Sequence, residues 1–189
     1  RPLGEGGMGI VYLAEQDEPV QRQVALKLVK LGMDSRAIVA RFEQERQALA
    51  WMQHDGIARV YDCGTTERGQ PYFVMELCAG EPLDRHADRR RLSVRQRIEL
   101  LLQVCAAVEH AHQKGVVHRD LKPGNVLVAG DGPDARVKVI DFGLAKSVAG
   151  ADGKLELHTE VGQVLGTPGY MAPEQAGAID APVDTRAAI

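Results

Sequence analysis

Two short polar segments of this 189-residue chain carry the residue types that phosphoryl transfer needs. The first is HRDLKPGN at 118–125, and the second is DFG at 141–143. A carboxylate such as Asp120 can orient an attacking hydroxyl and accept its proton. Carboxylate and amide oxygens, here Asp141 and Asn125, are ligands that Mg²⁺ prefers. Either aspartate alone could be an ordinary turn residue, but both segments in this order predict a phosphoryl-transfer site with Asp120 as the base.

A glycine-rich turn lies near the start of the chain. The pattern GxGxxGxV places glycines at Gly4, Gly6 and Gly9 and a valine at Val11. Without side chains, such glycines let backbone N–H groups close over a polyphosphate. The same spacing marks dinucleotide-binding folds, in which the glycines open a helix. Here residues 10–14 continue as a strand, which argues against a dinucleotide-binding fold.

Lysine and glutamate candidates for phosphate binding follow the glycine turn. Lys27 lies inside the apolar strand predicted at 24–29, where an unpaired ammonium would be unfavourable. The amphipathic helix predicted at 38–52 offers Glu45 as a partner, and this pair could hold Lys27 against the α- and β-phosphates. The alternative is that Lys27 extends to solvent at a strand edge and Glu45 is solvated. Lys122 is a further candidate, able to steady the γ-phosphate.

The remaining elements divide the chain into a strand-rich first part and a more helical second part. Strands are predicted at 57–61 and 71–77, joined as a hairpin by a turn-rich loop. A helix with Ser93 as its N-cap follows, and then strands at 126–128 and 136–140.

The helix after Ser93 is predicted to carry one apolar stripe, formed by Ile98, Leu101, Leu102, Cys105, Val108 and Ala111. This helix belongs to a second lobe. We therefore expect an N-terminal ATP-binding lobe at 1–79, with its first strand clipped, and a partial C-terminal catalytic lobe at 80–189.

Composition and charge argue against several classes of protein. The chain is 44% hydrophobic and 26% charged, as expected of a globular protein, and its net charge of −3 offers no large basic surface for nucleic acid. The arginine-rich run at 85–91 is either a partner-binding patch or, as is more common, a solvated face. His110 and His112 face different sides of a helix, which argues against a metal site.

Cysteine usage and hydropathy bear on the compartment. The three cysteines are scattered and lack metal-ligand spacing, which favours a reducing, cytoplasmic compartment. No apolar run is long enough to span a bilayer, so no membrane segment is expected in this fragment, although a parent chain could be membrane-anchored.

Three segments, GEGGMGIVYLAE, HRDLKPGN and GTPGYMAPEQA, closely resemble those of bacterial serine/threonine protein kinases of the eukaryotic-like family. The resemblance covers nearly the whole chain. It implies an α+β, two-lobe fold with a small antiparallel β lobe carrying one helix and a mainly helical lobe, here truncated. It also implies ATP and Mg²⁺ as cofactors, a protein Ser or Thr hydroxyl as acceptor, and self-phosphorylation.

The same resemblance implies roles for less conspicuous residues. Met75 would be the gatekeeper of the adenine site, and Glu76 and Cys78 would offer backbone groups to adenine. The residues that would sandwich the purine are Val11, Ala25 and Leu127. The spine that assembles the active state would consist of Leu49, Val60, His118 and Phe142.

Substrate class and regulation are implied by four positions. Lys122 after Asp120, and Thr167 before the APE segment, match the Ser/Thr branch of the family, in which both contact the catalytic aspartate. Arg119 matches an arginine that often pairs with a phosphorylated activation loop. Thr159 is our candidate phosphosite, and its alternative is an unmodified loop threonine.

The chain departs from the family pattern near its end. It stops at Ile189, where the family begins a long central helix, so Ile98, Leu101 and Leu102 are expected to lack packing partners. Ala188 stands where the family has an aspartate that anchors the HRD backbone. Two functions therefore remain: an active protein-Ser/Thr kinase, or a truncated, catalytically silent module that binds nucleotide or a partner.

Overall fold

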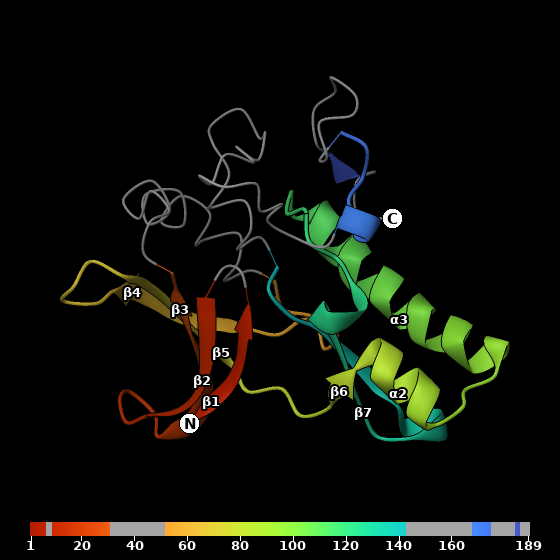
Figure 1. Cartoon of the computed structure of the whole chain (residues 1–189), viewed down its shortest axis with the longest axis horizontal. Helices are drawn as coiled ribbons and strands as arrows, with labels where there is room; N and C mark the ends of the chain where they lie inside the picture. The colour runs from red at the N-terminus through yellow and green to blue at the C-terminus, as the bar shows by residue number, and fades with distance from the viewer. Residues whose placement is uncertain (7–8, 31–51, 143–167, 175–183, 186–189) are drawn as a thin grey trace.

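The computed structural model describes residues 1–6, 9–30, 52–142, 168–174 and 184–185 (Figure 1). Within these ranges an N-terminal β-sheet is followed by a second part that contains a smaller sheet and two helices. The predictions outside the described residues concern most of the helix at 38–52, together with Glu45, Leu49, Thr159, Thr167 and Ala188.

Five antiparallel strands form the N-terminal sheet of the described chain, in the order β1-β2-β3-β5-β4. Their bounds are Pro2–Gly6 for β1, Gly9–Gln16 for β2, Arg22–Val29 for β3, Val60–Thr65 for β4 and Pro71–Glu76 for β5. The central position of β3 suits its aliphatic and β-branched residues, which pack well on a sheet with both edges covered. The predicted strand at 24–29 and the hairpin of β4 and β5 are confirmed.

The strand predicted at 57–61 is wrong in its bounds. Strand β4 begins only at Val60. Ile57 instead forms an isolated parallel bridge with Val139, far along the chain, and its side chain is fully buried. A short apolar run shows that a segment is buried but not which strand it meets, so the sequence could not separate these two pairings.

The register of the N-terminal sheet places four predicted nucleotide-binding residues on one face. Directly opposed residues of antiparallel strands point to the same face. Val11 lies opposite Lys27, and Ala25 lies opposite Met75. Because Ala25 and Lys27 are two residues apart on β3, all four side chains share this face. It is turned toward the second part of the chain, since Lys27 forms an ion pair with Asp141 there.

Gly9 allows β2 to approach β3 closely. A Cβ atom at Gly9 would lie 2.1 Å from the carbonyl oxygen of Leu28, whereas one at Gly6 would have nothing within 4 Å. We therefore expect Gly9→Ala to lower the free energy of unfolding by roughly 1–3 kcal/mol, as overpacking does. The matched variant Gly6→Ala should cost less than about 1 kcal/mol. Denaturant unfolding of both variants is the check, and equal losses would contradict the packing role of Gly9.

The second part of the chain, as far as it is described, contains a three-stranded antiparallel sheet, β6-β7-β8, and two helices. Their bounds are Glu81–Pro82 for β6, Leu83–Arg89 for α2, Val94–Gln113 for α3, Val126–Ala129 for β7 and Arg136–Val139 for β8. Short 3-10 turns lie at Pro123–Asn125, Gly132–Asp134 and Pro168–Tyr170. The strands predicted at 126–128 and 136–140 are confirmed to within one residue.

Helix α3 begins as predicted but buries a different face. Ser93 is its N-cap, in a capping box with Gln96. Ile98, Leu101 and Leu102 are 51–62% exposed, which confirms the expectation that they lack packing partners. The predicted stripe is a buried face only in part, because Cys105 is also exposed whereas Val108 and Ala111 are buried. The buried residues of α3 are Leu100, Val104, Ala107, Val108 and Ala111. Apolar residues surround much of this helix, so periodicity alone did not identify the packed face.

The arginine-rich run at 85–91 takes part in ion pairs within the chain. Arg89 pairs with Glu81 in β6, and Arg90 pairs with Asp131 in the turn before β8. Both arginines are substantially exposed. These pairs favour the interpretation of a solvated, structural face for this run.

Within the described ranges, no helix combines the length and the apolar character that spanning a membrane requires.

One hydrophobic cluster runs through both parts of the described chain. Ile57, which precedes β4, and Val139, at the end of β8, are fully buried. The same cluster includes Phe73 and Met75 from β5 and Ala107 from α3. A lobe boundary between residues 79 and 80 stays a prediction, and the two parts share a core across it. This shared core fixes β8, and hence the residues that follow it, relative to the N-terminal sheet.

Candidate active site

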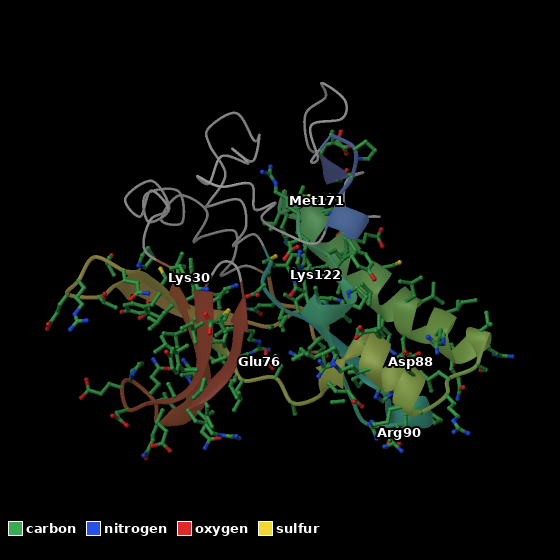
Figure 2. All side chains as sticks on the ribbon, viewed as in Figure 1. Lys30, Glu76, Asp88, Arg90, Lys122 and Met171 are labelled. Atoms are coloured by element: carbon green, nitrogen blue, oxygen red, sulfur yellow. The ribbon has the colours of Figure 1, made fainter. Side chains whose placement is uncertain are left out.

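The carboxylate of Asp120 is held by two neighbours of its own loop. Lys122 Nζ lies 2.8 and 3.1 Å from its two oxygens. Asn125 Nδ2 donates to Asp120 Oδ2 at 3.0 Å and to the Asp120 backbone carbonyl at 2.8 Å. The structure therefore brings together three of the four residues predicted to be catalytic, and Figure 2 shows Lys122 between the N-terminal sheet and α3.

The geometry of this loop follows from its sequence. Pro123 opens the 3-10 turn at Pro123–Asn125, a position where its missing N–H costs no hydrogen bond. The turn is closed by Asn125 N–H, which donates to the Lys122 carbonyl at 2.9 Å. Arg119 has a φ of 65°, in the left-handed region that non-glycine residues rarely adopt. Backbone strain of this kind clusters at functional sites.

The imidazole ring of His118 is neutral and anchors the start of the loop. The residue is fully buried, and its Nε2 lies 3.0 Å from the Ile140 carbonyl oxygen. Its Nδ1 accepts a hydrogen bond from the Asp120 backbone N–H at 3.3 Å. A ring that donates from Nε2 and accepts at Nδ1 is a neutral imidazole. Burial agrees with this assignment, because it lowers the pKa of His118.

Ile140 connects the Asp120 loop to Asp141. Its carbonyl accepts from His118, and its N–H donates to the Asn125 carbonyl at 2.9 Å. Both backbone groups of Ile140 are therefore hydrogen-bonded to the loop, which holds the next residue, Asp141, close to it. Asp141 has a φ of 63°, so the chain turns sharply at this point. The ring of Phe142 lies against His118, with 4.7 Å between ring centroids.

Lys27 bridges the two parts of the chain. Its Nζ lies 2.8 Å from Asp141 Oδ2, and the lysine is only 6% exposed. The expectation that Lys27 needs a charged partner is confirmed, and the alternative of a lysine that extends to solvent is wrong. The partner that the structure describes is Asp141, and Glu45 lies outside the described residues. The sequence did not reveal this partner, because the pairing depends on how β3 lies against the segment after β8 in the folded chain.

The residues predicted to contact the nucleotide lie in the N-terminal sheet, in the connection that follows β5 and, for Leu127, in β7. Ala25 and Met75 are buried, and Val11 and Leu127 are half-buried. Glu76 ends β5, and Cys78 lies two residues further along. Gly4 and Gly6 lie in the exposed strand β1. The contacts of all these residues with a nucleotide stay predictions.

Burial raises the pKa of the Cys78 thiol from 9.0 to about 11. Such a shift leaves about 100-fold less thiolate at neutral pH, and the thiolate is the reactive form. We expect iodoacetamide at about pH 7.5 to label the exposed Cys105 well before Cys78. Peptide mass spectrometry over a labelling time course gives the order. Faster labelling of Cys78 than of Cys105 would contradict the expectation.

Two parts of the site were not found from the sequence. The backbone of Ile140 anchors the loop from both sides, and Lys138 reaches Glu76 at the end of β5. An apolar residue next to a DFG segment gives no signal in the sequence that its backbone is hydrogen-bonded to another loop. A lysine in a β-strand gives none that it pairs with a residue 62 positions earlier.

Comparison with known proteins places these features in a family. A family profile described as "Protein kinase domain" matches residues 1–186. The serine/threonine-protein kinase PknA of Mycobacterium tuberculosis is 41% identical over 187 residues, which cover 96% of this chain and 41% of PknA. Serine/threonine-protein kinase Pkn1 of Myxococcus xanthus is 40% identical over 178 residues, 93% of this chain and 25% of Pkn1.

A similar solved structure supports the same placement. The PknI kinase domain of Mycobacterium tuberculosis superposes with a TM-score of 0.72 at 29% identity, covering 99% of this chain and 66% of that one. The chain thus spans about two fifths of the length of PknA. The two-lobe α+β fold implied by the resemblance is confirmed. This chain belongs to the protein kinase family, among its bacterial members.

Proposed function

We propose that this protein transfers the γ-phosphoryl group of ATP to Ser or Thr hydroxyls of proteins. The observation that carries the proposal is the Asp120 carboxylate, oriented by Lys122 and Asn125 and joined through Ile140 to Asp141. Positioning and electrostatic stabilisation supply most of the catalysis in phosphoryl transfer. The hydrogen bonds that hold the Asp120 loop support a role for it in positioning the reacting groups.

Asp120 acts as the base of the reaction. The acceptor hydroxyl oxygen forms a bond to the γ-phosphorus, the bond from that phosphorus to the β,γ-bridging oxygen breaks, and ADP leaves. The hydroxyl proton passes to Asp120. Lys122, which pairs with Asp120, is proposed to contact the transferred phosphoryl group as well, where its charge would offset developing negative charge. Thr167 is proposed to contact Asp120 from the activation segment.

The side chains of Asn125 and Asp141 fit a Mg²⁺ ion. Asn125 uses its Nδ2 on Asp120, which leaves Oδ1 as an oxygen donor. Asp141 contributes a carboxylate from the segment that follows β8. Mg²⁺ typically takes one or two such protein oxygens together with substrate phosphates. Bound there, it would supply charge neutralisation at the β- and γ-phosphates.

ATP itself is proposed to bind against the face of the N-terminal sheet that carries Lys27. Val11 and Ala25 lie on this face, and Leu127 is proposed to close the purine site from the second part of the chain. Glu76 and Cys78 would offer backbone groups to adenine. Gly4, Gly6 and Gly9 would cover the phosphates, and Glu45 would share Lys27 with Asp141.

Protein substrates and regulation are proposed on the family resemblance. Lys122 and Thr167 match the Ser/Thr branch. Self-phosphorylation at Thr159 would order the activation segment, because the phosphate would pair with Arg119. A cytoplasmic location is proposed for this domain. Phosphopeptide mass spectrometry of the active, complete protein tests Thr159, and an unmodified Thr159 in that sample would contradict this part.

The proposed reaction is tested with the complete protein, radiolabelled ATP and Mg²⁺, and a generic Ser/Thr-containing protein as acceptor. We expect label on the acceptor, recovered as phosphoserine and phosphothreonine, and its loss when EDTA removes the metal. Label on tyrosine would contradict the acceptor class. Nucleotide binding without any transfer would favour the alternative of a silent nucleotide- or partner-binding module.

A further inference from the structure

An ion pair joins the end of the N-terminal sheet to β8. Lys138 Nζ lies 2.9 Å from both carboxylate oxygens of Glu76. Glu76 is the last residue of β5, and Figure 2 shows it between the N-terminal sheet and β6. Lys138 is the third residue of β8. Each side chain is 25% exposed, so the pair is partly shielded from water.

Both members of this pair also bind the loop before β4. Arg59 N–H donates to Glu76 Oε2 at 3.1 Å, and Glu76 N–H donates to the Arg59 carbonyl at 2.8 Å. Lys138 Nζ lies 3.3 Å from the Ile57 carbonyl oxygen. We call Glu76, Lys138 and loop residues 56–59 the hinge clasp. Its two charges are therefore held by backbone groups as well as by each other.

The loop of the hinge clasp is itself fixed to β8. Ala58 N–H donates to the Val139 carbonyl at 2.9 Å, and Val139 N–H donates to the Gly56 carbonyl at 2.8 Å. The side chains of Ile57 and Val139 are fully buried at this junction. The loop and β8 thus hold each other in place. Glu76 binds to both of them, and the connection to β6 starts directly after Glu76.

The hinge clasp links two parts of the proposed nucleotide site. Residues 77–80 follow Glu76 and run to β6, and they include Cys78, whose backbone is proposed to contact adenine. Lys138 precedes Asp141 by three residues and lies opposite Leu127 in the register of β7 and β8. Lys138 therefore shares a sheet face with Leu127, the residue proposed to close the purine site.

We propose that Lys138 is a positioning residue for nucleotide binding, acting through Glu76 on the connection at 77–80. The proposal rests on the proposed function, since it concerns the same ATP site. Without the ammonium of Lys138, the Glu76 carboxylate keeps one backbone donor, and the start of the connection loses its charged link to β8. The connection then samples more conformations, and nucleotide binding must restrict them at the expense of affinity.

The test compares Lys138→Gln, Lys138→Arg and the control Lys114→Gln in the complete protein. Lys114 is exposed at the end of α3, outside the proposed site. The measurements are the Kd of a fluorescent ATP analogue with Mg²⁺, KM for ATP with kcat, and hydrogen exchange of peptides that cover 72–80. We expect Lys138→Gln to raise Kd and KM roughly 3- to 10-fold, about what one ordinary hydrogen bond contributes, because Lys138 acts on the nucleotide only through Glu76.

The proposal predicts a specific pattern across these measurements. In Lys138→Gln, kcat stays within about twofold and exchange at 77–80 is faster, because the change acts on nucleotide binding. Lys138→Arg recovers most of the affinity, and Lys114→Gln behaves as the unchanged protein. Unchanged Kd and exchange in Lys138→Gln would overturn the proposal, as would a fall in kcat at constant Kd or equal losses in Lys138→Arg.

The two proposals fail in different ways. If the unchanged protein transfers no phosphate, the proposed function fails, while analogue binding and hydrogen exchange still decide the role of Lys138. If transfer is normal and Lys138→Gln leaves nucleotide affinity unchanged, only the positioning role fails.

Discussion

Asp120→Asn is expected to lower the rate of phosphoryl transfer by about 10² to 10⁴, the range that a general base contributes. The asparagine side chain has nearly the same shape, but it cannot accept the hydroxyl proton. Initial rates with saturating ATP measure the change. The matched control is Asp131→Asn, an exposed carboxylate that pairs with Arg90 far from the loop, and its rate should stay within about twofold.

A binding measurement separates the chemical effect from a structural one. Asn125 and Lys122 both donate to the Asp120 carboxylate, so an amide there leaves one donor poorly matched. If the loop stays in place, the Kd of an ATP analogue changes little while the rate collapses. A transfer rate within about threefold of the unchanged protein would show that Asp120 is not the base. Equal losses of binding and rate would instead indicate that the loop has moved.

The residues of the Asp120 loop could be predicted because all the side chains that carry the chemistry belong to one short segment of the sequence. Asp120, Lys122 and Asn125 lie close together in the sequence, and a proline-initiated turn brings them together locally. The strands of the N-terminal sheet were predicted for a similar reason, since alternation and glycine-rich turns are local signals. Such features depend little on what the rest of the chain does.

The features that were missed depend on contacts between distant segments. Lys27 pairs with Asp141 because β3 and the segment after β8 lie together in the folded chain. Ile57 lies outside β4 because it bridges to Val139 instead. Helix α3 shows the same limit, since a stripe through Leu101 and a stripe through Val104 both have helical spacing, and only the partner surface selects between them. For Lys27 and Ile57 a local pattern indicated that the residue is paired or buried, and the tertiary structure determined the partner. For α3 the tertiary structure also determined which face is buried.

Asp141→Asn and Lys27→Met are both expected to lower phosphoryl transfer by at least about 10², as the loss of one electrostatic group at a reacting centre does. Asp141 is the proposed carboxylate for Mg²⁺, and Lys27 is the proposed contact of the α- and β-phosphates. Each variant also breaks the 2.8 Å ion pair between β3 and the segment after β8. Activity alone therefore does not distinguish the two variants, but their free energies of unfolding do.

The two variants should differ in the free energy of unfolding because the two members of the pair are buried to different degrees. The side chain of Lys27 is 8% exposed and that of Asp141 is 22% exposed. Asp141→Asn leaves a nearly buried ammonium without its described partner, at an expected cost of roughly 1–3 kcal/mol, whereas Lys27→Met leaves a carboxylate that water reaches, and should cost less. Lys30→Met, at an exposed lysine paired with Glu5, is the control and should stay within about 0.5 kcal/mol. Denaturant unfolding without nucleotide or metal measures all three, and a larger loss in Lys27→Met than in Asp141→Asn would show that the ammonium has another partner when Asp141 is neutral.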